Sequence, residues 1–296
     1  MLHPITFSIA KEKIIENIPE KTKIISSLIP GQLHTYIYNT EEEYYKEYQQ
    51  SFFATTIKKG GWDCLRHYEI MANGCIPFFP DIDQCPPNTL ALLPKDLLYE
   101  GNNLYNKFIK KTIQDLTPED LNEYTILVNK ILEFVKSHLT SKHIADYILH
   151  TSQRLQSKRI LFLSSQIEPD YLRCLTLHGF KELLGAECHD YPKIPHIYKT
   201  NTINYSSLYG KGITYTNLLE PALHNDTYDD QIYEMIQNRM YDTIIYGSHH
   251  RGKPLFDIVN QYYKPNEIIL LCGEDIHECT YNNWVNKGYN VFVREL

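Results

Sequence analysis

The sequence lacks several features that mark particular classes of protein. No stretch of about 18 apolar residues is present, so none is expected to span a bilayer as a helix. Residues 1–5 have neither the basic patch nor the apolar stretch of a signal peptide. Lysine and arginine form no long basic run, and the formal net charge of −7 argues against a general nucleic-acid binder. We therefore expect a cytoplasmic globular protein with no nucleic-acid partner and no transmembrane segment.

Cysteine usage gives no sign of disulfides or of a structural zinc site. The seven cysteines are odd in number, include no C-x-x-C pair and mostly lie inside apolar runs, as buried thiols do. Residues 274–279 contain residue types that bind zinc, but no partner motif occurs elsewhere. We expect no metal site and no required cofactor.

Strand and helix patterns alternate along the 296 residues. Such alternation predicts an α/β protein with parallel sheets covered by helices on both faces. Two lobes are expected, at residues 1–155 and 156–296, with the helical stretch 118–153 as a spine that is broken near residues 138–141. Strands are expected at 5–9, 23–29, 52–56, 75–79, 160–163, 243–246, 267–271 and 289–294. Helices are expected at 40–50, 62–73, 95–111, 169–184, 254–263 and 281–287.

The most informative segment surrounds the helix expected at residues 62–73. Lys58, Lys59, Gly60 and Gly61 precede it, and glycines there let backbone N–H groups approach a phosphate at the helix N-terminus. Along the helix, spacings of four, three and four align four side chains on one face, namely Trp62, Arg66, Glu69 and Asn73. Arg66 suits a phosphate and Glu69 suits sugar hydroxyls, although an ordinary ion pair on a solvated face explains the same two residues.

Residues 62–78, WDCLRHYEIMANGCIPF, resemble the donor-domain signature of exostosin-like and related GT-B glycosyltransferases, in which an Arg-x-x-Glu helix leads into a Gly-Cys-Ile-Pro strand. The resemblance implies two Rossmann-like lobes of GT-B type, here in permuted order because the donor-like segment comes first. It also implies that Glu69 holds the ribose of a nucleotide sugar and that Arg66, with Lys58 or Lys59, holds the diphosphate. Many retaining members carry an acidic residue eight positions before this glutamate, where this chain has Gly61.

The second lobe offers its own candidates where its strands end, because ligands bind at the carboxyl ends of parallel strands. Binding residues are expected among Ser164, Ser165, Ser248, His250 and Arg251. An inverting transferase needs a general base for the acceptor hydroxyl, and the candidates are Asp275, Glu274 and His249.

The sequence thus predicts a glycosyltransferase that moves a sugar from a nucleotide diphosphate sugar to a glycan or other hydroxyl acceptor. A non-catalytic nucleotide- or glycan-binding module of the same ancestry is one alternative. A metal-dependent transferase or phosphate-ester hydrolase is another, because Asp81 and Asp83 form a D-x-D triplet after a buried strand. A purely structural or interaction role is the third.

Overall fold

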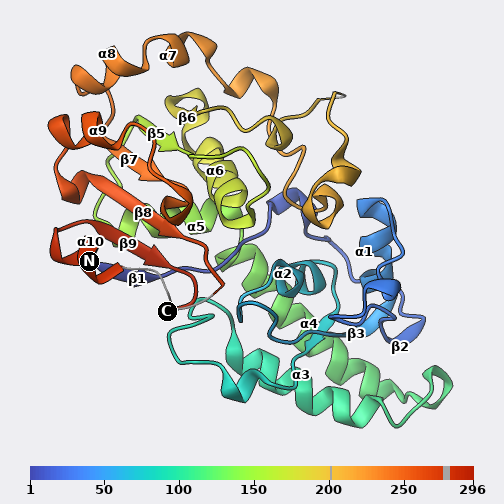
Figure 1. Cartoon of the computed structure of the whole chain (residues 1–296). Coiled ribbons are helices and arrows are strands. Elements are labelled where there is room, and N and C mark those ends of the chain that lie inside the picture. Colours follow the sequence, from blue (N-terminus) through green and yellow to red (C-terminus); the bar gives the residue numbers. More distant parts are fainter. Residues whose placement is uncertain (201, 276–280) are drawn as a thin grey trace.

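A computed structural model describes residues 1–200, 202–275 and 281–296 and has the predicted α/β architecture. All strand pairs are parallel, in one sheet of order β1-β9-β8-β7-β5-β6 and a second of order β2-β3-β4 (Figure 1). The strands are β1 (Leu2–Pro4), β2 (Lys23–Ile25), β3 (Ser51–Thr55), β4 (Ile76–Phe78), β5 (Ile160–Leu163), β6 (Cys188–Tyr191), β7 (Thr243–Tyr246), β8 (Ile268–Cys272) and β9 (Asn290–Val293).

The described α-helices are α1 (Glu41–Gln49), α2 (Leu65–Ala72), α3 (Lys95–Phe108), α4 (Pro118–His138), α5 (Ser141–Thr151), α6 (Tyr171–Leu184), α7 (Asp226–Asp230), α8 (Ile232–Gln237), α9 (Phe256–Tyr262) and α10 (Tyr281–Asn286). None of them, the 21-residue α4 included, is apolar enough over sufficient length to cross a membrane.

The six-stranded sheet is buried on both faces, because successive strand residues point to opposite sides. Ile160 and Phe162 of β5 face the core that contains α5 and α6, whereas Leu161 and Leu163 face the core that contains α8 and α9. Every side chain of β5 is therefore apolar, which explains why its sequence shows a continuous hydrophobic run rather than alternation.

The three-stranded sheet lies between α1 and α2 on one side and α3 and α4 on the other (Figure 1). Phe53 of β3 packs edge-on against Phe108 of α3 and Tyr124 of α4. Ala54 belongs to the opposite core with Tyr48 and other side chains of α1 and α2. Aromatic side chains thus fill the space between the spine and this sheet.

The predicted spine and its break are confirmed. Pro118 is the first residue of α4, so the helix begins at the predicted position. The Thr117 side chain caps it by accepting a hydrogen bond from the backbone N–H of Asp120. The chain leaves the helix after His138, and Thr140 caps α5. One continuous hydrophobic core includes side chains of the three-stranded sheet, of α4 and α5, and of the six-stranded sheet. The spine therefore packs against both sheets.

The N-terminal strand differs from its prediction. The strand is Leu2–Pro4 rather than residues 5–9, and it pairs with β9, so it belongs to the six-stranded sheet instead of the first lobe. Residues 5–9 are buried while the chain crosses between the sheets, and the Phe7 N–H donates to Asp63 Oδ2 at 2.7 Å rather than to a strand. The strand β6 and the helices α7 and α8 had no counterpart among the predicted elements.

Helix α2 is shorter than predicted, because it begins at Leu65 instead of residue 62. The four-residue polar stripe is therefore wrong at its first position: Trp62 lies in the loop before the helix. Arg66 and Glu69 remain one turn apart on α2.

Candidate functional site

A cleft of about 670 Å³ lies where the two sheets face each other. Its walls come from loops after the carboxyl ends of β2 and β3 in one sheet and of β5, β7 and β8 in the other. This is where parallel sheets bind ligands, and the volume is within the range of small-molecule sites. Its polar and aromatic lining includes Tyr36, Tyr38, Tyr44, Lys59, Gly60, Gly61, Asp63, Arg66, Glu69, Asp170, Tyr171, Tyr209, Lys211, Arg251 and Asp275.

Arg66 and Glu69 both line the cleft, but they do not form the solvated ion pair of the plainer interpretation. Glu69 is buried and accepts hydrogen bonds from Tyr44 Oη at 2.8 Å and from Thr214 Oγ1 at 2.6 Å. Burial raises the pKa of Glu69, although these hydrogen bonds act in the opposite direction. Arg66 Nη1 is buried, and no described residue accepts a hydrogen bond from it. Arg66 thus keeps a buried charged donor without a hydrogen-bond partner among the described residues, and an anionic ligand would satisfy it.

The glycine turn before α2 is already capped by a carboxylate of the chain itself. Glu295 accepts hydrogen bonds from the N–H groups of Trp62 and Asp63, at 2.9 and 3.0 Å. A Cβ atom at Gly61 would clash with Glu295. These two N–H groups are not available to a phosphate. The N–H groups of Cys64, Leu65 and Arg66, at the start of α2, have no acceptor among the residues that the structure describes.

A buried arginine ties the C-terminal end of β9 to this turn. Arg294 donates to the backbone oxygen of Asp63 and forms ion pairs with Glu295 and Asp275. Burial raises the pKa of Asp63 to about 7, even though Arg294 and the hydrogen bond from Phe7 favour its charged form. Asp275, which also lies against Gly60, thereby becomes part of the contact between the two sheets.

One wall of the cleft comes from the segment between β6 and α7, which extends towards α1 (Figure 1). Thr214 of this segment bonds Glu69, as described above, and its N–H donates to Glu41 Oε2 at 2.8 Å. Lys211 Nζ donates to the backbone oxygen of Tyr38 at 2.6 Å. Sequence reasoning missed both residues. The glycines on either side of Lys211, Gly210 and Gly212, were a signal in the sequence that the backbone packs closely against another segment there.

The cleft lining holds four basic and four acidic side chains, but most of the basic ones are unpaired among the described residues. Lys59, Arg66 and Lys211 form no ion pair with any described carboxylate. Arg251 is the exception, since its Nε lies 2.9 Å from Asp170 Oδ2. The three unpaired cations therefore favour an anionic ligand.

Two predicted donor-site residues lie outside the cleft lining. Lys58 Nζ stands over the Trp62 ring at 5.3 Å, and its N–H donates to Asp81 Oδ2 at 3.2 Å. Asn73 is fully buried and caps α2: its Nδ2 donates to the backbone oxygen of Glu69 and its Oδ1 accepts from Gln49, both at 2.8 Å. These contacts give Asn73 a structural role in the described fold.

Of the predicted site residues in the second lobe, some line the cleft and others do not. Arg251 and Asp275 line the cleft, whereas the remaining candidates lie outside its lining. Ser248 donates to Asp170 Oδ2 at 2.6 Å, and Ser165 donates to the backbone oxygen of Arg251 at 2.8 Å. Both serines therefore hold residues that line the cleft. The other residues outside the lining are Ser164, His249, His250 and Glu274.

The alternative metal motif does not converge on the cleft. Asp81 and Asp83 flank the start of a short 3-10 turn, and neither lines the cleft. Within the described residues, three potential metal ligands instead approach one another at His224, Asp226 and Asp229, a group that sequence reasoning missed. Of the residues 274–279 noted for zinc-binding types, positions 276–279 lie outside the described residues.

A second hollow, of about 790 Å³, lies beside α4 and α5. Its lining includes Phe134, His138, His143 and Tyr147, and its surface is more apolar than polar. It is the larger of the two, but it lies away from the strand ends and lacks the cluster of unpaired cations. The cleft between the sheets is therefore the better candidate site.

Comparison with family models, curated proteins and solved structures found no match to this chain.

Proposed function

We propose that the protein is a glycosyltransferase of GT-B type that binds a nucleotide diphosphate sugar in the cleft between its two sheets. The observation that carries the proposal is the position of Arg66, whose buried Nη1 has no described partner beside the first turn of α2. A diphosphate there would accept hydrogen bonds from Arg66 and from the helix N-terminus, where the helix dipole also favours negative charge. Lys59 and Lys211 add positive charge from two other segments of the cleft lining.

Sugar and nucleoside groups would contact the aromatic side of the cleft. Tyr36, Tyr38, Tyr171 and Tyr209 line it, and tyrosine combines an apolar ring with a polar hydroxyl. Glu69 would contact ribose only through the part of its carboxylate that Tyr44 and Thr214 leave open. In this proposal the Glu69 carboxylate orients the hydroxyl groups of Tyr44 and Thr214 and also accepts hydrogen bonds from the ribose.

Asp275 is the best placed of the three proposed bases, because it alone lines the cleft. In an inverting transfer it would take the proton of the acceptor hydroxyl while that oxygen attacks the anomeric carbon. The bond from this carbon to the diphosphate oxygen would break, and the diphosphate would leave with the electron pair towards Arg66. Asp275 must exchange its ion pair with Arg294 for the acceptor in this step.

A non-catalytic nucleotide- or glycan-binding module is the second candidate, and one observation favours it. The acidic side chains of the cleft are already engaged: Glu69 by hydroxyl groups, Asp170 by Arg251 and Asp275 by Arg294. An assay for nucleoside diphosphate released from a nucleotide sugar, in the presence of hydroxyl acceptors, distinguishes the transferase from the binding module. Binding without such release identifies the module.

The first experiment is a thermal-shift screen against nucleoside diphosphates and their sugars. A ligand at a hundred times its dissociation constant stabilises the folded state by about 2.7 kcal/mol. We expect one nucleotide class to stabilise the parent protein and to lose its effect in Arg66→Ala. If no nucleotide shifts the transition, the proposed function is wrong.

A further inference from the structure

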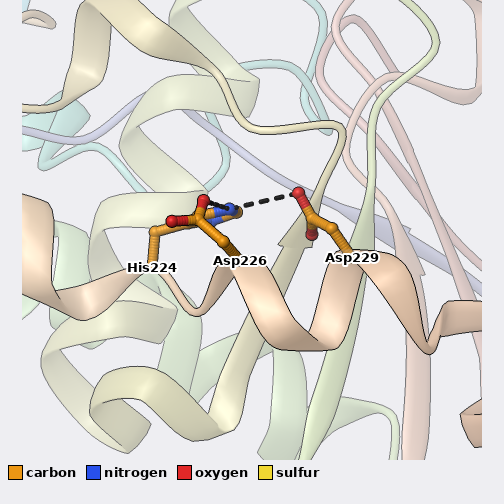
Figure 2. Close-up of side chains that lie close together, drawn as sticks. All are labelled: His224, Asp226 and Asp229. Atoms are coloured by element: carbon orange, nitrogen blue, oxygen red, sulfur yellow. Dashed lines mark hydrogen bonds and ion pairs between the residues drawn. The ribbon is translucent and has the colours of Figure 1, made fainter.

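A cluster of ionisable side chains lies outside the cleft, beside the edge strand β6. His224 precedes α7, which carries Asp226 and Asp229 one turn apart. Figure 2 shows Asp226 and Asp229 with their carboxylates close to the imidazole of His224. Its Nε2 lies 3.4 Å from Asp226 Oδ1 and 3.2 Å from Asp229 Oδ2. Three potential ligand atoms from a single short segment therefore meet at one point.

The surroundings hold this imidazole in a fixed orientation. Asp190, at the end of β6, accepts from His224 Nδ1 at 3.0 Å, so Nε2 is the nitrogen that faces the two aspartates. In metal sites, a carboxylate commonly accepts a hydrogen bond from the histidine nitrogen that does not bind the metal. This contact orients the imidazole and increases its basicity. Asp229 is fixed as well, because its Oδ1 lies 2.7 Å from His189 Nε2.

The electrostatic balance also favours a cation at Nε2. Three carboxylates surround His224, and Lys181 pairs with Asp190 at 2.8 Å. The other nearby cation is Lys193, a half-buried residue whose Nζ stands over the Tyr198 ring at 5.1 Å. The protein therefore stabilises positive charge at this position.

We propose that His224 Nε2, Asp226 and Asp229 bind one zinc ion. A tetrahedral ion with bonds of about 2.0–2.1 Å needs ligand atoms roughly 3.3–3.4 Å apart, which is close to the two separations that His224 makes. The nitrogen ligand favours zinc over magnesium and calcium, which take oxygen ligands. Asp226 is 91% exposed, so solvent can supply the fourth ligand.

Zinc at this site would fasten the segment that forms one wall of the cleft. The chain from β6 to α7 begins next to Asp190 and ends at His224, and it carries Lys211 and Thr214 between them. The site uses none of the residues of the proposed nucleotide site, so either proposal can fail without the other.

Zinc binding by the full chain tests the proposal, with competition against a chromophoric chelator as the readout. Asp226→Asn is the principal variant, since this side chain is exposed and we expect its replacement to leave the fold intact. Asp229→Asn is the second variant. Asp230→Asn is the matched control, because it changes an exposed aspartate of the same helix that is not part of the cluster. Cobalt(II) is a second probe, since its absorption distinguishes thiolate ligands from nitrogen and oxygen ligands.

We expect the parent and Asp230→Asn to bind one equivalent of zinc at least tenfold more tightly than Asp226→Asn and Asp229→Asn. Bound cobalt should show a tetrahedral spectrum without thiolate charge transfer. Equal zinc affinity of the parent and Asp226→Asn overturns the proposal. So does a cobalt spectrum dominated by thiolate that Asp226→Asn leaves unchanged, because the ion then resides at cysteines.

Discussion

Replacement of Glu295 by alanine should destabilise the protein strongly, because this side chain joins the last strand to the loop before α2. Its carboxylate is buried, accepts hydrogen bonds from the N–H groups of Trp62 and Asp63 and pairs with Arg294. Hydrogen bonds to charged groups contribute about 1.5–3 kcal/mol each, and breaking one partner of a buried ion pair costs about 3–5 kcal/mol. These terms overlap, so we expect a loss of about 3–5 kcal/mol in the free energy of unfolding.

Urea denaturation followed by tryptophan fluorescence suits this test, because Trp62 lies at the affected loop. The matched control is Glu234→Ala, which removes an exposed glutamate from α8 and should change stability by no more than about 0.5 kcal/mol. A loss below about 1 kcal/mol in Glu295→Ala would refute the reasoning, since the two N–H groups would then be satisfied without the carboxylate.

Three further changes test other parts of the structure. Asp63 has a folded-state pKa of about 7 against about 3.9 when unfolded, so the folded state binds more protons and stability should fall as pH rises from about 4 to about 7. Asp63→Asn should flatten this slope in denaturation curves taken across that range, and an unchanged slope contradicts the assignment. Gly61→Ala should cost about 1–3 kcal/mol by overpacking against Glu295, whereas Gly273→Ala, which meets only ordinary contacts, should cost less in the same unfolding assay. Lys211→Met should weaken nucleotide binding in calorimetry about tenfold, whereas loss of the exposed Lys199 should not, and equal affinities would remove Lys211 from the site.

Local patterns predicted most elements of this fold. The helices expected from residues 40 and 118 begin at residues 41 and 118, and their caps, Thr40 and Thr117, each accept a hydrogen bond from an N–H only three positions ahead. Contacts as short as these are contained in the local sequence. The apolar runs at β5, β7 and β8 are strands of a sheet that is buried on both faces. A continuous hydrophobic run predicts such a strand, because side chains on both faces must be apolar.

The details of the cleft depend on contacts between distant residues, and local spacing does not contain them. The sequence around Gly60 and Gly61 predicted free N–H groups for a phosphate, whereas Glu295, more than 230 positions away, accepts those of Trp62 and Asp63. Glu69 looked accessible on a helix face, but Thr214 covers it from 145 positions away. For the same reason the cluster at His224 was missed: its two nearby aspartates are visible in the sequence, but the orienting carboxylate of Asp190 comes from another strand.

The central claim is that Arg66 and its neighbours bind the diphosphate of a nucleotide sugar. Calorimetric titration with inorganic pyrophosphate tests it without any assumption about the base or the sugar. The parent protein should bind one equivalent, and Arg66→Ala should weaken binding at least tenfold. Arg239→Ala, which removes an exposed arginine paired with Glu267, should not change it. Absence of pyrophosphate binding, or equal affinity of the parent and Arg66→Ala, would contradict the account.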